Sequence, residues 1–214
     1  GERTTREFKI VREDIEIPTI DTELRADGIF VIKLYSFSEN SANLFRGAIQ
    51  QFQTSGSSKL ILDLRGNPGG YLDSAVSIGS LFIDEGKTIV SEDFGTSRKP
   101  VVYRSRGPKL FNDKLNLIVL MDGGSASASE ILAGALREHK VATLVGTRTF
   151  GKGSVQELVS VTDDTSLKVT VAKWLTPNGL SISEQGLAPD VEVKFTEKDV
   201  EANRDPQLEK AVEI

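Results

Sequence analysis

Hydrophobic and polar positions change their spacing along the chain, and each spacing predicts a kind of element. Short, nearly continuous apolar runs at residues 59–64 and 115–121 are typical of buried strands. Alternation of apolar and charged positions over residues 8–20 predicts an extended, half-exposed strand, which Pro18 confines to a sheet edge. Further strands are predicted at residues 29–35, 88–90, 101–103, 142–145 and 189–193.

Apolar residues at helical spacing predict helices at residues 41–53, 72–82, 127–138 and 205–212. The residues expected on the buried sides of the first two are Leu44, Ala48, Ile49 and Phe52, then Ala75, Ile78, Gly79 and Phe82. A second alternating stretch, residues 154–174, predicts a hairpin that turns at residues 162–165. Strand–helix–strand units with an added β-hairpin predict an α/β fold.

Composition narrows the classes of function. The chain has 214 residues, 38% of them hydrophobic, which suits an ordinary globular core. A net charge of −5 gives no reason to expect nucleic acid as a partner. Cysteine is absent, which excludes disulfides, thiol catalysis and Cys-ligated zinc. Acidic residues lack metal-binding spacing, so neither a metal nor a cofactor is expected. No apolar run approaches the roughly 20 residues of a membrane span, and no signal peptide opens the chain.

A serine stands where a buried strand turns into a helix, in the segment Gly-Ser-Ala-Ser-Ala-Ser-Glu at residues 124–130. Free N–H groups at a helix start favour negative charge, so the N–H of Ala128 could stabilise an oxyanion formed beside Ser127. A second donor could come from Gly69 or Gly70, in a loop that also follows a buried strand. The plainer interpretation is helix capping by the serines, with Glu130 completing a capping box.

Lysine is a better candidate than histidine for the base of such a serine. His139, the one histidine, lies in the same predicted helix, about 18 Å from Ser127 at about 1.5 Å rise per residue. Lys152 lies between glycines in a second loop and must be desolvated to be a neutral base, and Phe150 beside it allows burial. Gln156 would share a strand face with it and could orient the amine. A solvated loop charge is the plainer interpretation of Lys152.

A phosphate-binding loop is the rival interpretation of residues 146–152, which fit the start of the P-loop pattern. The next position should be Ser or Thr to hold magnesium, but it is Gly153. A helix should follow, yet residues 154–161 alternate like a strand. A nucleotide-binding module is therefore disfavoured.

At these residues the sequence resembles the C-terminal processing peptidases, also called tail-specific proteases. Residues 62–70 resemble the glycine-rich block of that family, residues 124–136 its nucleophile block, and residues 149–153 with Gln156 its lysine block. Residues 176–179 and 186–191 resemble its downstream signatures. The resemblance implies a crotonase-like, Clp-protease-like α/β core.

By position, the resemblance implies that Ser127 is the nucleophile, Lys152 the general base and Gln156 the residue that orients the lysine. It implies Ala128 and Gly70 as oxyanion donors, with Gly69 as the adjacent alternative. The function expected is a serine endopeptidase with a Ser–Lys dyad that cuts proteins near their C-termini. The alternative is a non-catalytic relative that uses the same fold to bind a peptide or an apolar ligand.

Domain organisation and location also follow from the resemblance. Family members usually carry a PDZ domain before the core, so we expect a catalytic core without it: residues 1–25 as a connecting strand, 26–196 as the core and 197–214 as a tail helix. The expected substrates are proteins or peptides with apolar C-terminal tails. The family implies a place outside the cytoplasm, in the periplasm, cell envelope or thylakoid lumen. Nothing in the sequence predicts the oligomeric state.

Overall fold

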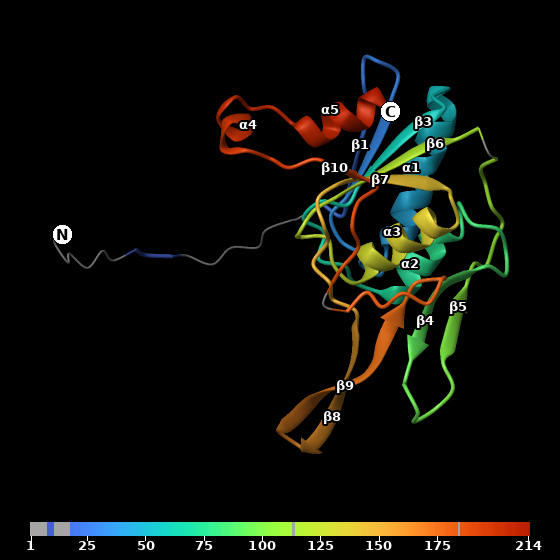
Figure 1. Ribbon diagram of the computed structural model, residues 1–214, viewed down its shortest axis with the longest axis vertical. Coiled ribbons are helices and arrows are strands. Elements are labelled where there is room, and N and C mark those ends of the chain that lie inside the picture. Colours follow the sequence, from blue (N-terminus) through green and yellow to red (C-terminus); the bar gives the residue numbers. More distant parts are fainter. Residues whose placement is uncertain (1–7, 11–17, 113, 184) are drawn as a thin grey trace.

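The computed structural model describes residues 8–10, 18–112, 114–183 and 185–214, whose strands form two sheets (Figure 1). Within the larger sheet β1 pairs antiparallel with β2, and the other neighbours are parallel. Its strand order is β1 (Ile20–Leu24), β2 (Phe30–Leu34), β3 (Lys59–Asp63), β6 (Asn116–Met121), β7 (Ala142–Gly146) and β10 (Val191–Glu192). The smaller, antiparallel sheet has the order β5 (Val101–Arg104), β4 (Thr88–Asp93), β9 (Thr165–Leu175) and β8 (Ser154–Thr162).

Helices cover both faces of the larger sheet, which explains why its central strands β3 and β6 are apolar apart from their end residues. One face packs against α1 (Ser41–Ser55), α2 (Leu72–Gly79) and α3 (Ala128–Glu138) in the main core. The other face packs against α5 (Pro206–Glu213), and the short helix α4 (Glu197–Glu201) precedes α5 (Figure 1). The predicted α/β fold is confirmed, and α4 is the helix that the sequence pattern missed.

The parallel pairing decides where the sequence motifs lie. Strands β3, β6 and β7 are adjacent and parallel, so their carboxyl ends meet at one edge of the sheet. The loops after these three strands are residues 64–71, 122–127 and 147–153. They carry the glycine-rich, serine and lysine segments, so the topology gathers all three at one edge, where ligands bind in open α/β sheets.

Three details of the predicted elements differ in the structure. Residues 8–10 have no regular structure, residues 11–17 lie outside the described part, and the first strand begins only at Ile20. This strand pairs with β2, so the larger sheet includes residues that the predicted boundary at residue 25 leaves in the connecting segment. In α1, Leu44 is 39% exposed, and Phe45 is fully buried in its place against Phe82.

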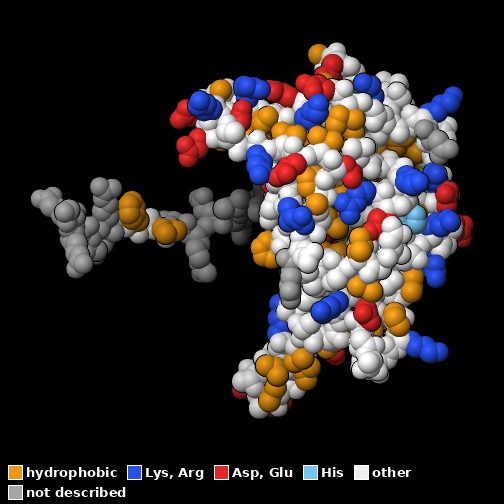
Figure 2. All heavy atoms as spheres, viewed as in Figure 1, with side chains coloured by type: hydrophobic (Ala, Val, Ile, Leu, Met, Phe, Trp, Pro, Cys, Tyr) orange, Lys and Arg blue, Asp and Glu red, His pale blue; other side chains and the backbone are white. Residues whose placement is uncertain are grey.

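The hairpin of β8 and β9 projects from the body of the molecule (Figure 1). It turns at residues 162–165, as predicted. Its outer part exposes large apolar side chains, and hydrophobic atoms gather on it in Figure 2. The most exposed of them are Leu158, Val161 and Leu167. Only near its base does the hairpin enter the core, through Ala172 and Trp174.

Candidate active site

The glycine-rich loop after β3 is built around the buried side chain of Asn67. Its amide nitrogen donates to the carbonyl of Leu34 at 2.7 Å, and its amide oxygen accepts the N–H of Gly69 at 2.9 Å. Gly69 and Gly70 have φ angles of 98° and 144°, which side chains rarely tolerate. A Cβ on Gly70 would lie 2.2 Å from the carbonyl oxygen of Phe37. Glycine is therefore required, and the loop presents backbone at this edge of the sheet.

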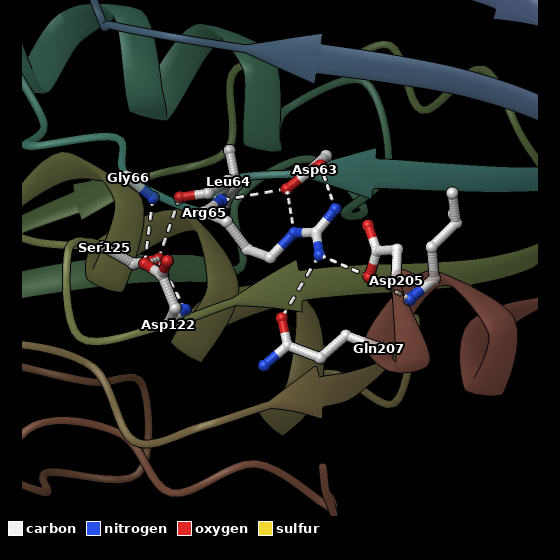
Figure 3. Close-up of polar contacts among 9 residues, drawn as sticks. Asp63, Leu64, Arg65, Gly66, Asp122, Ser125, Asp205 and Gln207 are labelled. Carbon is white, nitrogen blue, oxygen red and sulfur yellow. Dashed lines mark hydrogen bonds and ion pairs between the residues drawn. The ribbon is translucent and has the colours of Figure 1, made fainter. Parts of the chain in front are cut away.

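The loop after β6 is fastened to the glycine-rich loop by serines that do not cap the helix. The hydroxyl of Ser125 donates to the carbonyl of Leu64 at 2.8 Å (Figure 3). The hydroxyl of Ser129 donates to the carbonyl of Asn67 at 3.0 Å, and the N–H of Ala126 donates to the same carbonyl at 3.0 Å. Two of the three serines thus have structural partners in the neighbouring loop.

Ser127 immediately precedes α3 in a conformation that is unusual for a residue with a side chain. Its φ and ψ are 55° and −113°, and the residue is half-buried. Such a conformation costs about 1–3 kcal/mol and persists where the surrounding structure imposes it, often at functional sites. A Cβ built on Gly69 would lie 2.8 Å from Cβ of Ser127 and 2.9 Å from the nitrogen of Ala128. The two loops are thus in direct contact at the serine.

The candidate oxyanion donors differ in availability. Within the described residues, the N–H groups of Ala128 and Gly70 have no acceptor. The N–H of Gly69, by contrast, is already bonded to the side chain of Asn67. Of the two glycines, Gly70 is therefore the one that offers a free donor.

The glutamate at the start of α3 connects the serine to the lysine loop, a role that the sequence did not reveal. Glu130 is fully buried, and its two carboxylate oxygens each accept two hydrogen bonds. One oxygen, Oε2, accepts the N–H of Ser127 at 2.8 Å and the N–H of Lys152 at 3.0 Å. The other, Oε1, accepts the hydroxyl of Thr149 at 2.5 Å and the N–H of Gly151 at 2.7 Å.

The capping-box pattern predicts reciprocal contacts between Glu130 and Ser127 alone, and of these the bond from the N–H of Ser127 to Glu130 is present. One signal in the sequence indicates that Glu130 has further partners: three apolar residues, Ile131, Leu132 and Ala133, follow it directly. A charged residue that is buried in so apolar a stretch needs hydrogen-bonding partners. The sequence alone could not say that those partners come from the loop after β7.

The side chain of Lys152 does not lie as expected. Lys152 is exposed, and so is Phe150, at 66% of its surface, so the predicted burial of the lysine by Phe150 is wrong. Strand β8 begins only at Ser154, and its pairing with β9 shifts register just before Gln156. Gln156 is also exposed, and among the described residues no hydrogen bond joins the side chains of Ser127, Lys152 and Gln156. The structure brings together the backbones of Ser127 and Lys152.

The rival interpretations lose support. A strand, not a helix, follows Gly153, which removes the phosphate-binding loop. His139 lies at the opposite end of α3 from Ser127, as predicted, and it is half-buried, with Nε2 2.7 Å from the carbonyl oxygen of Thr88. In the part of the chain that the structure describes, no cluster of acidic residues and histidine could hold a metal ion.

Comparison with known proteins identifies the family of the chain. Residues 28–193 match the model of peptidase family S41. The chain belongs to peptidase family S41. The match includes all three loops and every strand of the two sheets except β1. The resemblance seen in the sequence and the serine-peptidase class are therefore confirmed.

Two curated proteins illustrate what this S41 chain is similar to. It is 38% identical over 189 residues to the carboxy-terminal processing protease CtpA of Bacillus subtilis, an alignment that covers 88% of this chain and 40% of the relative. It is 37% identical to a probable CtpA-like serine protease of Staphylococcus haemolyticus, covering 88% of this chain and 38% of that protein. The chain thus spans about 40% of the length of the curated relatives it matches.

Solved structures support the fold. The photosystem II D1 C-terminal processing protease superposes with a TM-score of 0.77 at 30% identity, covering 86% of this chain and 50% of that one. The tricorn protease superposes with a TM-score of 0.57 at 19% identity, covering 86% of this chain and 17% of that one, and this likeness concerns the fold alone. The predicted crotonase-like, Clp-protease-like fold class is consistent with these neighbours.

Proposed function

We propose that this chain is the catalytic part of a serine endopeptidase in which Ser127 is the nucleophile and Lys152 the general base. The observation that carries the proposal is the carboxylate of Glu130. It accepts the N–H groups of both residues on a single oxygen atom and so holds the two backbones next to each other. The free N–H groups of Ala128 and Gly70 support the proposal, because the reaction needs two donors beside the serine.

The reaction follows from these positions. The Oγ of Ser127 attacks the scissile carbonyl carbon while the amine of Lys152 takes the hydroxyl proton. The carbonyl oxygen becomes an oxyanion, and the N–H groups of Ala128 and Gly70 stabilise it. The tetrahedral intermediate collapses, the peptide C–N bond breaks, and the proton passes from Lys152 to the leaving amine. Water then attacks the acyl-enzyme with Lys152 as base again, which releases the new C-terminus and restores Ser127.

The exposed side chain of Lys152 defines what has to change when substrate binds. The backbone of the lysine is fixed by Glu130, while its side chain can turn about its own bonds toward Ser127. Catalytic hydrogen bonds are often long or poorly aligned in unliganded enzymes and tighten in the complex with substrate. Gln156, at the start of the hairpin, would then hold the amine by its side-chain amide.

The same exposure favours a second candidate, a peptide-binding relative that performs no chemistry. Such a protein would bind peptides at this edge of the sheet, but its Ser127 would be no more reactive than an ordinary serine. Reaction of Ser127 with an acylating or phosphonylating reagent separates the two candidates.

Substrate and location are part of the proposal. The named relatives are C-terminal processing proteases, and we infer that this chain cuts protein or peptide substrates with apolar C-terminal tails outside the cytoplasm. None of the helices in the described residues is long and apolar enough to cross a membrane.

Cleavage of matched peptides tests the substrate class. Two peptides of equal length are incubated with the protein, one ending in apolar residues and one in charged residues, and mass spectrometry locates the cut. Faster cleavage of the apolar-tailed peptide, lost in Ser127→Ala, is the expected result. Equal cleavage of both peptides would contradict the tail preference, and cleavage retained in Ser127→Ala would contradict the nucleophile.

A further inference from the structure

An arginine at the start of the glycine-rich loop links the C-terminal helix to the end of β3. The guanidinium of Arg65 donates to both carboxylate oxygens of Asp63, at 2.9 and 2.7 Å (Figure 3). It also donates to Asp205 at 2.8 Å and to the side-chain oxygen of Gln207 at 3.2 Å. The side chain of Arg65 is only 16% exposed. Burial lowers the pKa of Arg65, but the hydrogen bonds to Asp63 and Asp205 outweigh it and raise the pKa.

The helix end that carries Asp205 is itself firmly held. Asp205 caps α5, since its carboxylate accepts the N–H of Leu208 at 2.9 Å. Gln207 is buried and donates to the carbonyl of Val193 at 2.8 Å, just beyond β10. Ala211 and its neighbours on α5 pack on the outer face of the sheet. Arg65 is thus anchored to a helix that the sheet fixes in place.

From Arg65 a short path of contacts leads to the serine. The next residue, Gly66, donates its N–H to the carboxylate of Asp122 at 2.8 Å, in the loop after β6 (Figure 3). Asn67 follows, and its side chain fixes Gly69. The start of the glycine-rich loop therefore lies between two anchors, the guanidinium on one side and Asp122 on the other.

We propose that Arg65, held by Asp205 and Gln207 of the α5 segment, is a positioning residue that sets the conformation of residues 66–70 and thereby aims the N–H of Gly70 at the oxyanion. The inference rests on the proposed function, because it takes this loop as the source of an oxyanion donor. It makes α5, on the far face of the sheet, a contributor to the site.

The test compares two variants of α5 that lose the same charge. Asp205→Asn removes the carboxylate that faces Arg65, while asparagine still caps the helix. Glu209→Gln is the matched control, since Glu209 pairs with Arg204 on the exposed side of α5 and makes no contact with Arg65. Two quantities are measured on the whole chain: amide hydrogen exchange over residues 64–72, and the saturating rate of Ser127 phosphonylation by a fluorophosphonate with its half-saturation concentration.

The expected result is faster exchange over residues 66–70 in Asp205→Asn, together with a roughly tenfold lower saturating rate, in line with the effect of small displacements on catalysis. The half-saturation concentration stays unchanged, and Glu209→Gln behaves like wild type. If the contact between Asp205 and Arg65 were purely structural, Asp205→Asn would lower thermal stability. It would not lower the saturating rate while leaving the half-saturation concentration unchanged.

Two outcomes overturn the inference: unchanged exchange in Asp205→Asn, or faster exchange with an unchanged phosphonylation rate. A wild-type chain in which Ser127 does not react, yet in which exchange rises in Asp205→Asn, sinks the proposed function and leaves the coupling of α5 to the loop standing. A failure of the inference about Arg65 is thus distinguishable from a failure of the proposed function.

Discussion

Replacing Glu130 with glutamine tests whether the buried carboxylate holds the serine and lysine loops together. Glutamine has nearly the same shape, but only one of its two terminal atoms accepts hydrogen bonds. The other is an NH₂ group, which would face two donors. The donors that Glu130 now satisfies are the N–H groups of Ser127, Gly151 and Lys152 and the hydroxyl of Thr149.

The size of the effect follows from the number of bonds lost. A hydrogen bond to a charged group contributes about 1.5–3 kcal/mol, so loss of two lowers the free energy of unfolding by about 3–6 kcal/mol. A domain is stable by only about 5–15 kcal/mol. In a chain of this length each kcal/mol shifts Tm by about 2–4 °C, so we expect Tm to fall by about 6–24 °C. The rate of Ser127 phosphonylation should fall as well, because both loops move apart.

Circular dichroism measures Tm, and mass spectrometry follows phosphonylation at a temperature where the variant is folded. Glu138→Gln is the control at the other end of α3, where the carboxylate accepts a single backbone N–H, that of Asn178. The reasoning is refuted if Glu130→Gln melts within about 2 °C of wild type and its Ser127 reacts at the wild-type rate.

Three further predictions test other parts of the account. Gly69→Ala should lower activity about a hundredfold, because its Cβ would collide with Ser127; Gly123→Ala, whose Cβ would meet open space, should leave peptide cleavage unchanged. Burial raises the pKa of Asp205, but the hydrogen bond from Arg65 outweighs burial and holds it below its ordinary value. The ionised side chain of Asp205 therefore stabilises the fold at pH values above the ordinary carboxyl pKa. This stabilisation is lost as pH falls through the lowered pKa. In acid titrations followed by urea unfolding, the stability difference between wild type and Asp205→Asn should stay constant above about pH 5 and shrink below about pH 4; a constant difference down to pH 2 contradicts the sign. Phe45→Ala should cost about 3–5 kcal/mol and Leu44→Ala less than about 1 kcal/mol, since only the phenylalanine is buried; equal urea midpoints would show that the helix face is misassigned.

The sequence predicted most of the fold because the apolar pattern reports burial directly. Strands β3 and β6 are apolar apart from their end residues because helices cover both faces of the sheet. The pattern misplaced Leu44, because two adjacent apolar residues satisfy nearly the same helical spacing and only packing selects Phe45. It also could not show that the apolar positions of the β8–β9 hairpin are exposed, since alternation predicts a strand but not what covers it.

The candidate site was predictable in its residue types but not in its connections. Ser127 and the glycine-rich loop could be singled out because strand ends and glycines are visible in the sequence. The link through Glu130 depends on the parallel order of β3, β6 and β7, which brings loops far apart in the chain to one edge. The pattern placed the start of the hairpin at residue 154, as in the structure, but alternation along a strand does not show how the side chain of Lys152, two residues before that start, is oriented.

The central claim is that Lys152 activates Ser127, and the phosphonylation rate of Ser127 tests it most directly. A fluorophosphonate is incubated with wild type, Lys152→Ala and the control Lys140→Ala, an exposed lysine just beyond α3. The adduct is located and timed by mass spectrometry. The account predicts an adduct on Ser127 in wild type and Lys140→Ala, and a rate lower by about a hundredfold or more in Lys152→Ala, as for loss of a general base. An equal rate in Lys152→Ala and wild type, or no adduct on Ser127 in wild type, would contradict it.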